Sequence, residues 1–170
     1  MIPEVLNSGA IYLAGYSFYG DPFNSSSAWT EENEIGTLWK RFEAFCTERR
    51  NEMPSTAVQN LGYEVHIWNK ETFTTGHYEV FVGFQLTTIS AASILPVDLS
   101  IKIIPANRYA VFTLSGDIIT EDWTTRVSSE WLPNQGLKQT GNYSFNLYDD
   151  RFKGMDRIDE SEMMVYVPVE

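Results

Sequence analysis

The stretch that decides the fold is Ile101–Gly116, IKIIPANRYAVFTLSG. Its first residues include three β-branched isoleucines, which favour an extended strand. Pro105 interrupts the ladder of backbone hydrogen bonds because it carries no N–H. The run YAVFTL then resumes strand character, and Gly116 ends it. The stretch therefore predicts one long β-strand broken by a single turn and followed by a helix-entry loop.

The sequence before this stretch predicts a strand, a helix and two further strands. Residues 9–16 form a short apolar run, and residues 17–29 form a polar loop of a length that often lines binding sites. We expect a helix over Thr30–Arg50, capped by Thr30, because its apolar side chains recur at helical spacing. Residues 61–69 and 77–86 alternate as strands do, on either side of a hairpin loop.

The sequence from residue 98 onward repeats this order of elements. Thr120 is expected to cap a second helix, which presents Trp123, Val127 and Trp131 at a spacing of four. Residues 142–148 and 163–167 alternate as strands and enclose a charged loop. Two halves with the same order indicate an internal duplication.

These elements predict one α+β domain over residues 1–170, built from two βαββ units at about 8–88 and 98–169. We expect the units to be related by a pseudo-twofold axis in an antiparallel sheet. Two helices would cover one face of the sheet, and the other face would be concave. A central cleft between two related halves is a natural place for a ligand.

Composition and charge narrow the possible partners. Of 170 residues, 43% are hydrophobic and 14% aromatic, which is a globular composition, and the formal net charge is −11. This negative charge disfavours direct binding to nucleic acid and to anionic membranes. The N-terminus has no secretory signal and no apolar run approaches the ~18 residues of a membrane span. We therefore expect a soluble, cytoplasmic protein.

Cysteine and histidine are scarce. One cysteine, Cys46, excludes a disulfide within the chain, and His66 and His77 are too few and too badly spaced for a typical zinc site. We expect no metal and no cofactor.

Four segments in order resemble a known family. They are IPANRYAVF with the following SG, EWLPNQG, YSFNLYDDRF and MMVYVPV. Together they resemble the GyrI-like small-molecule-binding domain, which is also the effector-binding domain of AraC- and MerR-type multidrug regulators. AGY, IGTLWKRF, GYEV and YEVFVGFQL in the first half match more loosely.

The resemblance implies a duplicated βαββ domain whose cleft takes lipophilic, often cationic and aromatic, drug-like molecules. In regulators this domain is fused to a helix-turn-helix domain, and we expect no such domain in this chain. The expectation is a stand-alone binding module without direct nucleic acid contacts, leaving open a regulator or another protein as a partner in trans.

One position departs from the family pattern. The resemblance implies a glutamate on the strand before the YDDRF run, where it is the buried partner of a cationic ligand, but this chain has Asn146 there. An amide does not neutralise a cation, so the acid must come from elsewhere. Glu64 and Glu79 are the acids available on strands, and alternation alone does not decide which of them faces the cleft.

Aromatic side chains are the other expected part of the site, because each aromatic face can attract a cation by roughly 0.5–2 kcal/mol. The candidate ligand-binding residues are Tyr16, Glu64, Trp68, Phe81, Trp123, Asn146, Tyr148 and Tyr166. Core packing is the alternative for each aromatic residue in this set. We assign Trp39 and Trp131 to the core, and a structural role to His66.

Two other classes of function stay open as alternatives. Some relatives are thought to hydrolyse strained cyclopropanoid compounds, which requires a carboxyl group and an aromatic hydroxyl near the substrate. Asn146 argues against this reading, and the sequence has neither a Gly-x-Ser-x-Gly motif nor a phosphate-binding loop, so we assign no catalytic residue. The second alternative is a protein-interaction inhibitor of the gyrase-inhibitor type, whose acidic loop at 149–162 contacts a basic partner.

Overall fold

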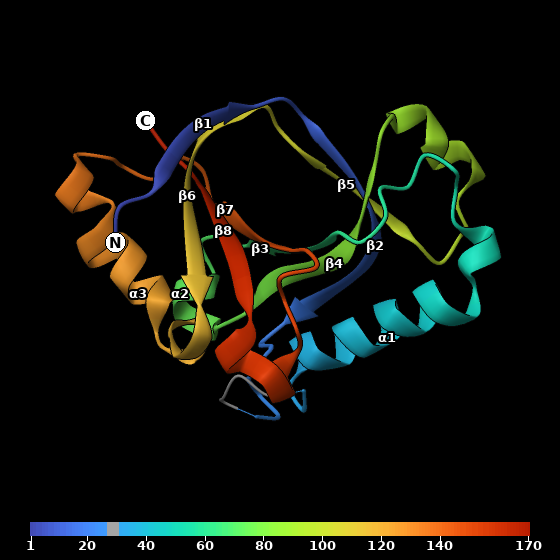
Figure 1. Ribbon diagram of the computed structural model, residues 1–170, viewed down its shortest axis with the longest axis horizontal. Helices are drawn as coiled ribbons and strands as arrows, with labels where there is room; N and C mark the ends of the chain where they lie inside the picture. Colours follow the sequence, from blue (N-terminus) through green and yellow to red (C-terminus); the bar gives the residue numbers. More distant parts are fainter. Residues whose placement is uncertain (27–30) are drawn as a thin grey trace.

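The computed structural model describes residues 1–26 and 31–170. Within them, eight strands form one antiparallel sheet in the order β1-β6-β8-β7-β3-β4-β2-β5 (Figure 1). The strands are β1 (Glu4–Ser8), β2 (Ile11–Gly20), β3 (Gly62–Ile67), β4 (Tyr78–Leu86), β5 (Ser100–Ile104), β6 (Asn107–Ser115), β7 (Tyr143–Tyr148) and β8 (Glu162–Pro168). The predicted α+β class and the antiparallel sheet are confirmed.

Helices are fewer and shorter than strands. They are α1 (Glu34–Glu48), α2 (Thr72–Thr75) and α3 (Trp123–Arg126), and α3 continues as a π-helical segment, Val127–Trp131. Short 3₁₀ turns occur at Arg50–Glu52, Ile89–Ile94, Gly116–Thr120, Pro133–Gln135 and Met155–Glu160. None of the described helices is long and apolar enough to cross a membrane.

The stretch that decides the fold forms β5 and β6, and the ladder breaks at Pro105 as predicted. β1 pairs with β6, and this ladder ends where Ser8 lies opposite Asn107. β2 pairs with β5, and this ladder starts where Ile11 lies opposite Ile104. The register is therefore continuous across the break, as in one long antiparallel ribbon. Since β1 and β5 stand at opposite ends of the strand order, this ribbon connects the two ends and the sheet curls (Figure 1).

One face of the curled sheet packs against itself. Leu13, Val65, Phe81, Tyr109 and Phe145 on this face are 0% exposed and belong to one apolar cluster. The prediction of a concave face opposite the helices is therefore wrong, because apolar side chains from both halves of the chain fill this face.

The other face of the sheet carries two helical layers. Under α1, Phe42 and Phe45 pack on Phe84 of β4. Under α3 and its π-helical extension, Trp131 packs on Phe112 of β6 at 5.3 Å between ring centroids. Trp131 thus lies in the core, as expected from the sequence.

The helix starts differ from the predicted ones. The side chain of Asn33 caps α1 by accepting a hydrogen bond from the backbone N–H of Gly36 at 2.9 Å, and the predicted cap, Thr30, lies outside the described residues. Asp122 caps α3 in the same way. The prediction of Thr120 as this cap is wrong, because Thr120 ends the preceding 3₁₀ turn and Asp122 offers a carboxylate closer to the helix.

The structure has strand residues at two places where the sequence does not predict them. One is the whole of β1, which forms because Glu4–Ser8 pair with β6. β2 continues to Gly20 where a polar loop was expected from Ser17, because Ser17–Gly20 pair with β4. Tertiary pairing overrides the polar local sequence in both cases.

Two glycines face each other where β2 and β4 approach closely. A Cβ atom on Gly15 would lie 2.0 Å from the carbonyl oxygen of Val82, and one on Gly83 would lie 2.2 Å from that of Ala14. No side chain fits at either position without separating the strands.

Gly15→Ala should therefore lower the free energy of unfolding by about 1–3 kcal/mol, the usual effect of overpacking. Urea denaturation measures this change. Gly9→Ala is the matched control, because nothing lies within 4 Å of a Cβ at Gly9 and its effect should stay within about 0.5 kcal/mol. Equal stability of the two variants would contradict the close approach of β2 and β4.

Candidate functional site

A row of directly paired residues crosses the centre of the face that carries the helices. It places Val82 of β4, Glu64 of β3, Asn146 of β7 and Val165 of β8 side by side. The two valines belong to the cores beneath α1 and α3. The two central residues are polar and yet buried, with 3% of Glu64 and 1% of Asn146 exposed. The middle of this face is therefore polar, whereas its flanks are apolar core.

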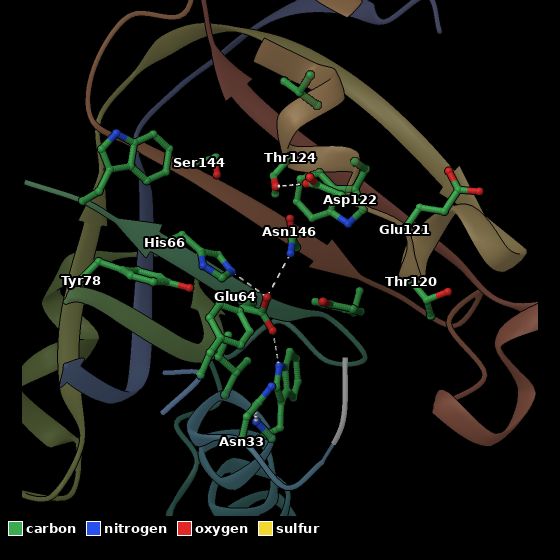
Figure 2. Close-up of a pocket in the computed structure, with 18 of the residues that line it drawn as sticks. Asn33, Glu64, His66, Tyr78, Thr120, Glu121, Asp122, Thr124, Ser144 and Asn146 are labelled. Atoms are coloured by element: carbon green, nitrogen blue, oxygen red, sulfur yellow. Dashed lines mark hydrogen bonds and ion pairs between the residues drawn. The ribbon is translucent and has the colours of Figure 1, made fainter. Parts of the chain in front are cut away.

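A cavity of about 920 Å³ lies over these two polar residues. Strands β3 and β7 line one side of it, the first half of α1 lines a second, and α3 with the turn before it lines a third. Figure 2 shows side chains from these elements converging on the cavity. Its size falls within the range of about 300–1,000 Å³ that is typical of small-molecule sites.

Glu64 is the centre of a hydrogen-bond network. Its Oε2 accepts from Nε1 of Trp39 at 2.6 Å, and its Oε1 accepts from Nδ2 of Asn146 at 3.0 Å and lies 2.8 Å from Nε2 of His66 (Figure 2). Burial alone would raise the pKa of Glu64, but the bond and charge of the imidazole together with the other two donors hold it below its usual value. Glu64 is therefore a buried carboxylate that is ionised at neutral pH.

Glu64, and not Glu79, is the acid that faces the cavity. Glu79 binds Nζ of Lys102 at 2.7 Å and Oγ of Ser17 at 3.2 Å, and it does not line the cavity. Glu64 stands directly across the β3–β7 ladder from Asn146. The carboxylate thus comes from the strand next to the one on which the resemblance places it.

The cavity brings together five of the eight candidate residues named from the sequence. They are Glu64, Trp68, Trp123, Asn146 and Tyr148. Trp68 comes just after β3, Tyr148 ends β7 and Trp123 starts α3, so three separate elements supply these aromatic walls.

Tyr16, Phe81 and Tyr166 lie elsewhere in the molecule. Tyr16 is on the helix-bearing face but under α1, and its hydroxyl donates to Asp98 at 3.1 Å. Phe81 and Tyr166 point to the opposite face, because successive strand residues alternate. There Tyr166 stacks on Phe145 at 4.6 Å between ring centroids.

Two residues that line the cavity were given other roles from the sequence. Trp39, which the sequence assigns to the core, does pack against both core clusters, and its indole N–H also donates to Glu64 at the cavity. A buried tryptophan N–H needs an acceptor, and this requirement is the signal that could have found it. His66 follows Glu64 by two residues on one strand, so period-two alternation already placed both on one face.

Acidic side chains also surround the exposed part of the cavity. Among the lining residues, Lys40 is the one lysine, and it pairs with Glu31 at 3.3 Å. Burial, followed by the charge of Glu31, raises the pKa of Glu43. The lining carboxylates are Glu31, Glu43, Glu64, Glu121 and Asp122. These carboxylates outnumber the basic side chains among the lining residues, so the lining carries a net negative formal charge.

Two buried polar atoms at the cavity have no hydrogen-bond partner among the described residues. They are Oδ1 of Asn146 and the hydroxyl oxygen of Tyr148. Burial, together with the charge of Glu64, raises the pKa of Tyr148 well above its usual value, so the phenol is neutral. Over residues 1–26 and 31–170, no cluster of three or more His, Cys, Asp or Glu side chains could hold a metal ion.

Comparison with known proteins identifies a family and a curated relative that match nearly the whole of this chain. The family model Cass2, described as integron-associated effector binding protein, matches residues 8–169. The transcriptional regulator BrlR of Pseudomonas aeruginosa is 24% identical over 172 residues, which cover 99% of this chain and 56% of BrlR. The chain therefore spans little more than half the length of this curated relative.

Solved structures share the fold at low sequence identity. SAV2435 bound to tetraphenylphosphonium gives a TM-score of 0.69 at 13% identity, over 100% of this chain and 94% of that one. The integron cassette protein VCH_CASS2 of Vibrio cholerae gives 0.61 at 14% identity, over 98% and 95%.

The pairing of one carboxylate with one amide predicts the effect of a second acid. In Asn146→Asp, the new carboxylate faces Glu64 across the ladder, and this like-charge pair raises the pKa of the shared site. The folded variant then holds a proton that the unfolded chain releases, so its free energy of unfolding should fall as pH rises between about 5 and 8. Denaturation at several pH values measures this slope.

The native protein should behave in the opposite way, because the pKa of Glu64 is lowered. The contribution of Glu64 to the free energy of unfolding is fully present above the ordinary carboxyl pKa, and it is lost as pH falls through the lowered pKa of the folded protein. The double variant Glu64→Gln with Asn146→Asp restores one acid and one amide, and it should remove the slope seen in Asn146→Asp. A slope for Asn146→Asp equal to that of the native protein would contradict the direct pairing.

Proposed function

The chain belongs to the Cass2 family of integron-associated effector binding proteins, and from this premise we propose that its central cavity binds lipophilic cations that carry aromatic rings. This family membership agrees with the sequence motifs, which resemble those of effector-binding domains. The cavity, rather than the filled opposite face of the sheet, is the proposed ligand site.

The observation that carries this proposal is the ionised carboxylate of Glu64 beside an open cavity. A buried charge is costly unless it is paired. Three donors hold Glu64 in place, and of these only His66 can itself carry a positive charge. A cationic ligand in the cavity would place a further positive charge near Glu64 in surroundings of low dielectric constant, where such attraction is strong.

Aromatic walls support the same ligand class. Trp68, Trp123 and Tyr148 present rings to the cavity from three elements, and Trp39 adds a fourth that meets Tyr148 edge to face at 5.0 Å between ring centroids. Such faces attract both apolar ring systems and cations. SAV2435, which shares the fold, is bound to tetraphenylphosphonium, a cation with aromatic rings.

We also infer that the two halves derive from one duplicated βαββ unit. β2, α1, β3 and β4 follow one another in the first half, and β6, α3, β7 and β8 follow in the second. The strand order supports this inference, because β3 of one half pairs with β7 of the other at the centre of the sheet. Glu64 and Asn146 then occupy matching positions of the two units.

Glu64→Gln tests the proposed role of the carboxylate. The cation tetraphenylphosphonium should bind the native protein, and the variant should bind it at least about tenfold more weakly, because a desolvated charge interaction is lost. A neutral aromatic dye should bind both proteins within about twofold, since apolar contact and ring stacking remain. Titration followed by tryptophan fluorescence measures both affinities.

Glu79→Gln is the matched control for Glu64→Gln. It removes the same charge from a neighbouring strand but does not touch the cavity. Cation affinity should be unchanged in this variant. An equal loss of affinity in both variants would mean that the net charge of the protein, and not the position of Glu64, causes the effect. Failure of the cation to bind the native protein would overturn the proposed function.

A further inference from the structure

The orientation of the Asn146 amide is fixed by its neighbour. Its Nδ2 lies 3.0 Å from Oε1 of Glu64, and an ionised carboxylate only accepts hydrogen bonds. The amide nitrogen must therefore face Glu64, and the amide oxygen must face away from it. Figure 2 shows this arrangement, with Oδ1 turned away from the carboxylate.

The oxygen that faces away has no partner among the described residues. Asn146 is 1% exposed and lines the cavity, and its Oδ1 is buried without a hydrogen bond. A buried acceptor left without a donor is unfavourable. The hydroxyl of Tyr148, two residues along the same strand, is buried and without a partner in the same way. This end of the cavity therefore offers hydrogen-bonding groups that the described part of the chain does not satisfy.

Glu64 itself has little capacity left for a directional hydrogen bond. A carboxylate has about four acceptor positions, and three are occupied by Trp39, His66 and Asn146. A bound cation would therefore interact with Glu64 mainly through charge, and the free acceptor next to that charge is Oδ1 of Asn146.

We propose that this cavity, in the cation-binding role assigned above, selects cations that carry an N–H group, with Oδ1 of Asn146 as the acceptor for that N–H. The ligand class is then protonated amines and amidinium groups on an aromatic body, in preference to quaternary ammonium or phosphonium ions. This inference rests on the proposed function and adds the chemical class that the site prefers.

The physical reason is the difference between a carboxylate and an amide at this position. A carboxylate attracts any cation through its charge, whereas an amide oxygen gains most from a donor that points at it. A charged N–H donor makes a stronger hydrogen bond than a neutral one. A cation without N–H would fill the space and leave Oδ1 unpaired, and sites with buried polar groups reject analogues that leave those groups unpaired.

Two matched ligands provide the test. One is an aromatic compound with a quaternary trimethylammonium group, and the other has the same aromatic body with an N-ethyl-N-methyl tertiary amine, which has the same number of carbon atoms. At a pH where the amine is fully protonated, both carry one positive charge and differ in the N–H. Calorimetric titration of the native protein should give at least about tenfold tighter binding of the protonated amine, as expected for a hydrogen bond to a charged donor.

Two variants assign the preference to a residue. Asn146→Leu removes the acceptor and keeps the branching of the side chain at Cγ, so the ratio of the two affinities should fall to about one. Ser144→Ala is the matched control on the same face of β7, and it should keep the native ratio. Because the ratio compares two ligands on one protein, a general loss of affinity in a less stable variant cancels. If Asn146→Leu does not fold, two measurements still test the proposal. The native protein should prefer the protonated amine, and Tyr148→Phe should keep this preference, because Oδ1 of Asn146 is still present.

Each outcome separates this inference from the proposed function. Equal binding of the two cations to the native protein would overturn the selection for N–H and leave cation binding intact. A preference that survives in Asn146→Leu would overturn the assignment to Oδ1. No binding of either cation would overturn the proposed function itself.

Discussion

The structure of the site depends on keeping one negative charge buried at the centre of the sheet. Glu64 occupies the middle of a row in which the outer residues are core valines, and it is 3% exposed. Such a position is tolerated because Trp39 from α1, His66 from the same strand and Asn146 from the adjacent strand all bind the carboxylate. The network therefore ties both halves of the chain and the first helix to one group.

The curled sheet explains why a cavity remains beside this charge. The continuous ribbon of β1 and β2 with β5 and β6 bends the sheet, and apolar side chains fill the face opposite the helices. On the other face, α1 and α3 each cover the flank of their own half. The central strands β3 and β7 lie between these two cores, and the cavity lies over them. Core packing and ligand space are thus assigned to different parts of one sheet.

Local sequence predicted the elements well and the site in part. Alternation located β3, β4, β7 and β8, and the break at Pro105 was placed correctly. The same alternation does not show that Tyr16 is covered by α1, or that Phe81 and Tyr166 point into the core on the opposite face of the sheet. Alternation separates the two faces of a strand, but which face lines a cavity depends on how the helices and the other strands pack against it. Helical spacing predicts that the ring of Trp39 packs against the core, which it does, but spacing carries no signal for the hydrogen bond from its N–H to Glu64. Glu64 was already a candidate, but the choice of Glu64 over Glu79 needed the register, which places Glu64 opposite Asn146.

The ionisation of Glu64 in the protein without ligand is the central claim, and its side-chain carboxyl carbon reports it directly. The ¹³C chemical shift of that carbon, followed by NMR across the acid range, gives its pKa. We predict titration below the usual glutamate range and a carboxylate at neutral pH, with a shift change when a cation is added. A carboxyl group that titrates above the usual range and is protonated at neutral pH would contradict the account, because the cavity would then hold no buried charge for a cation.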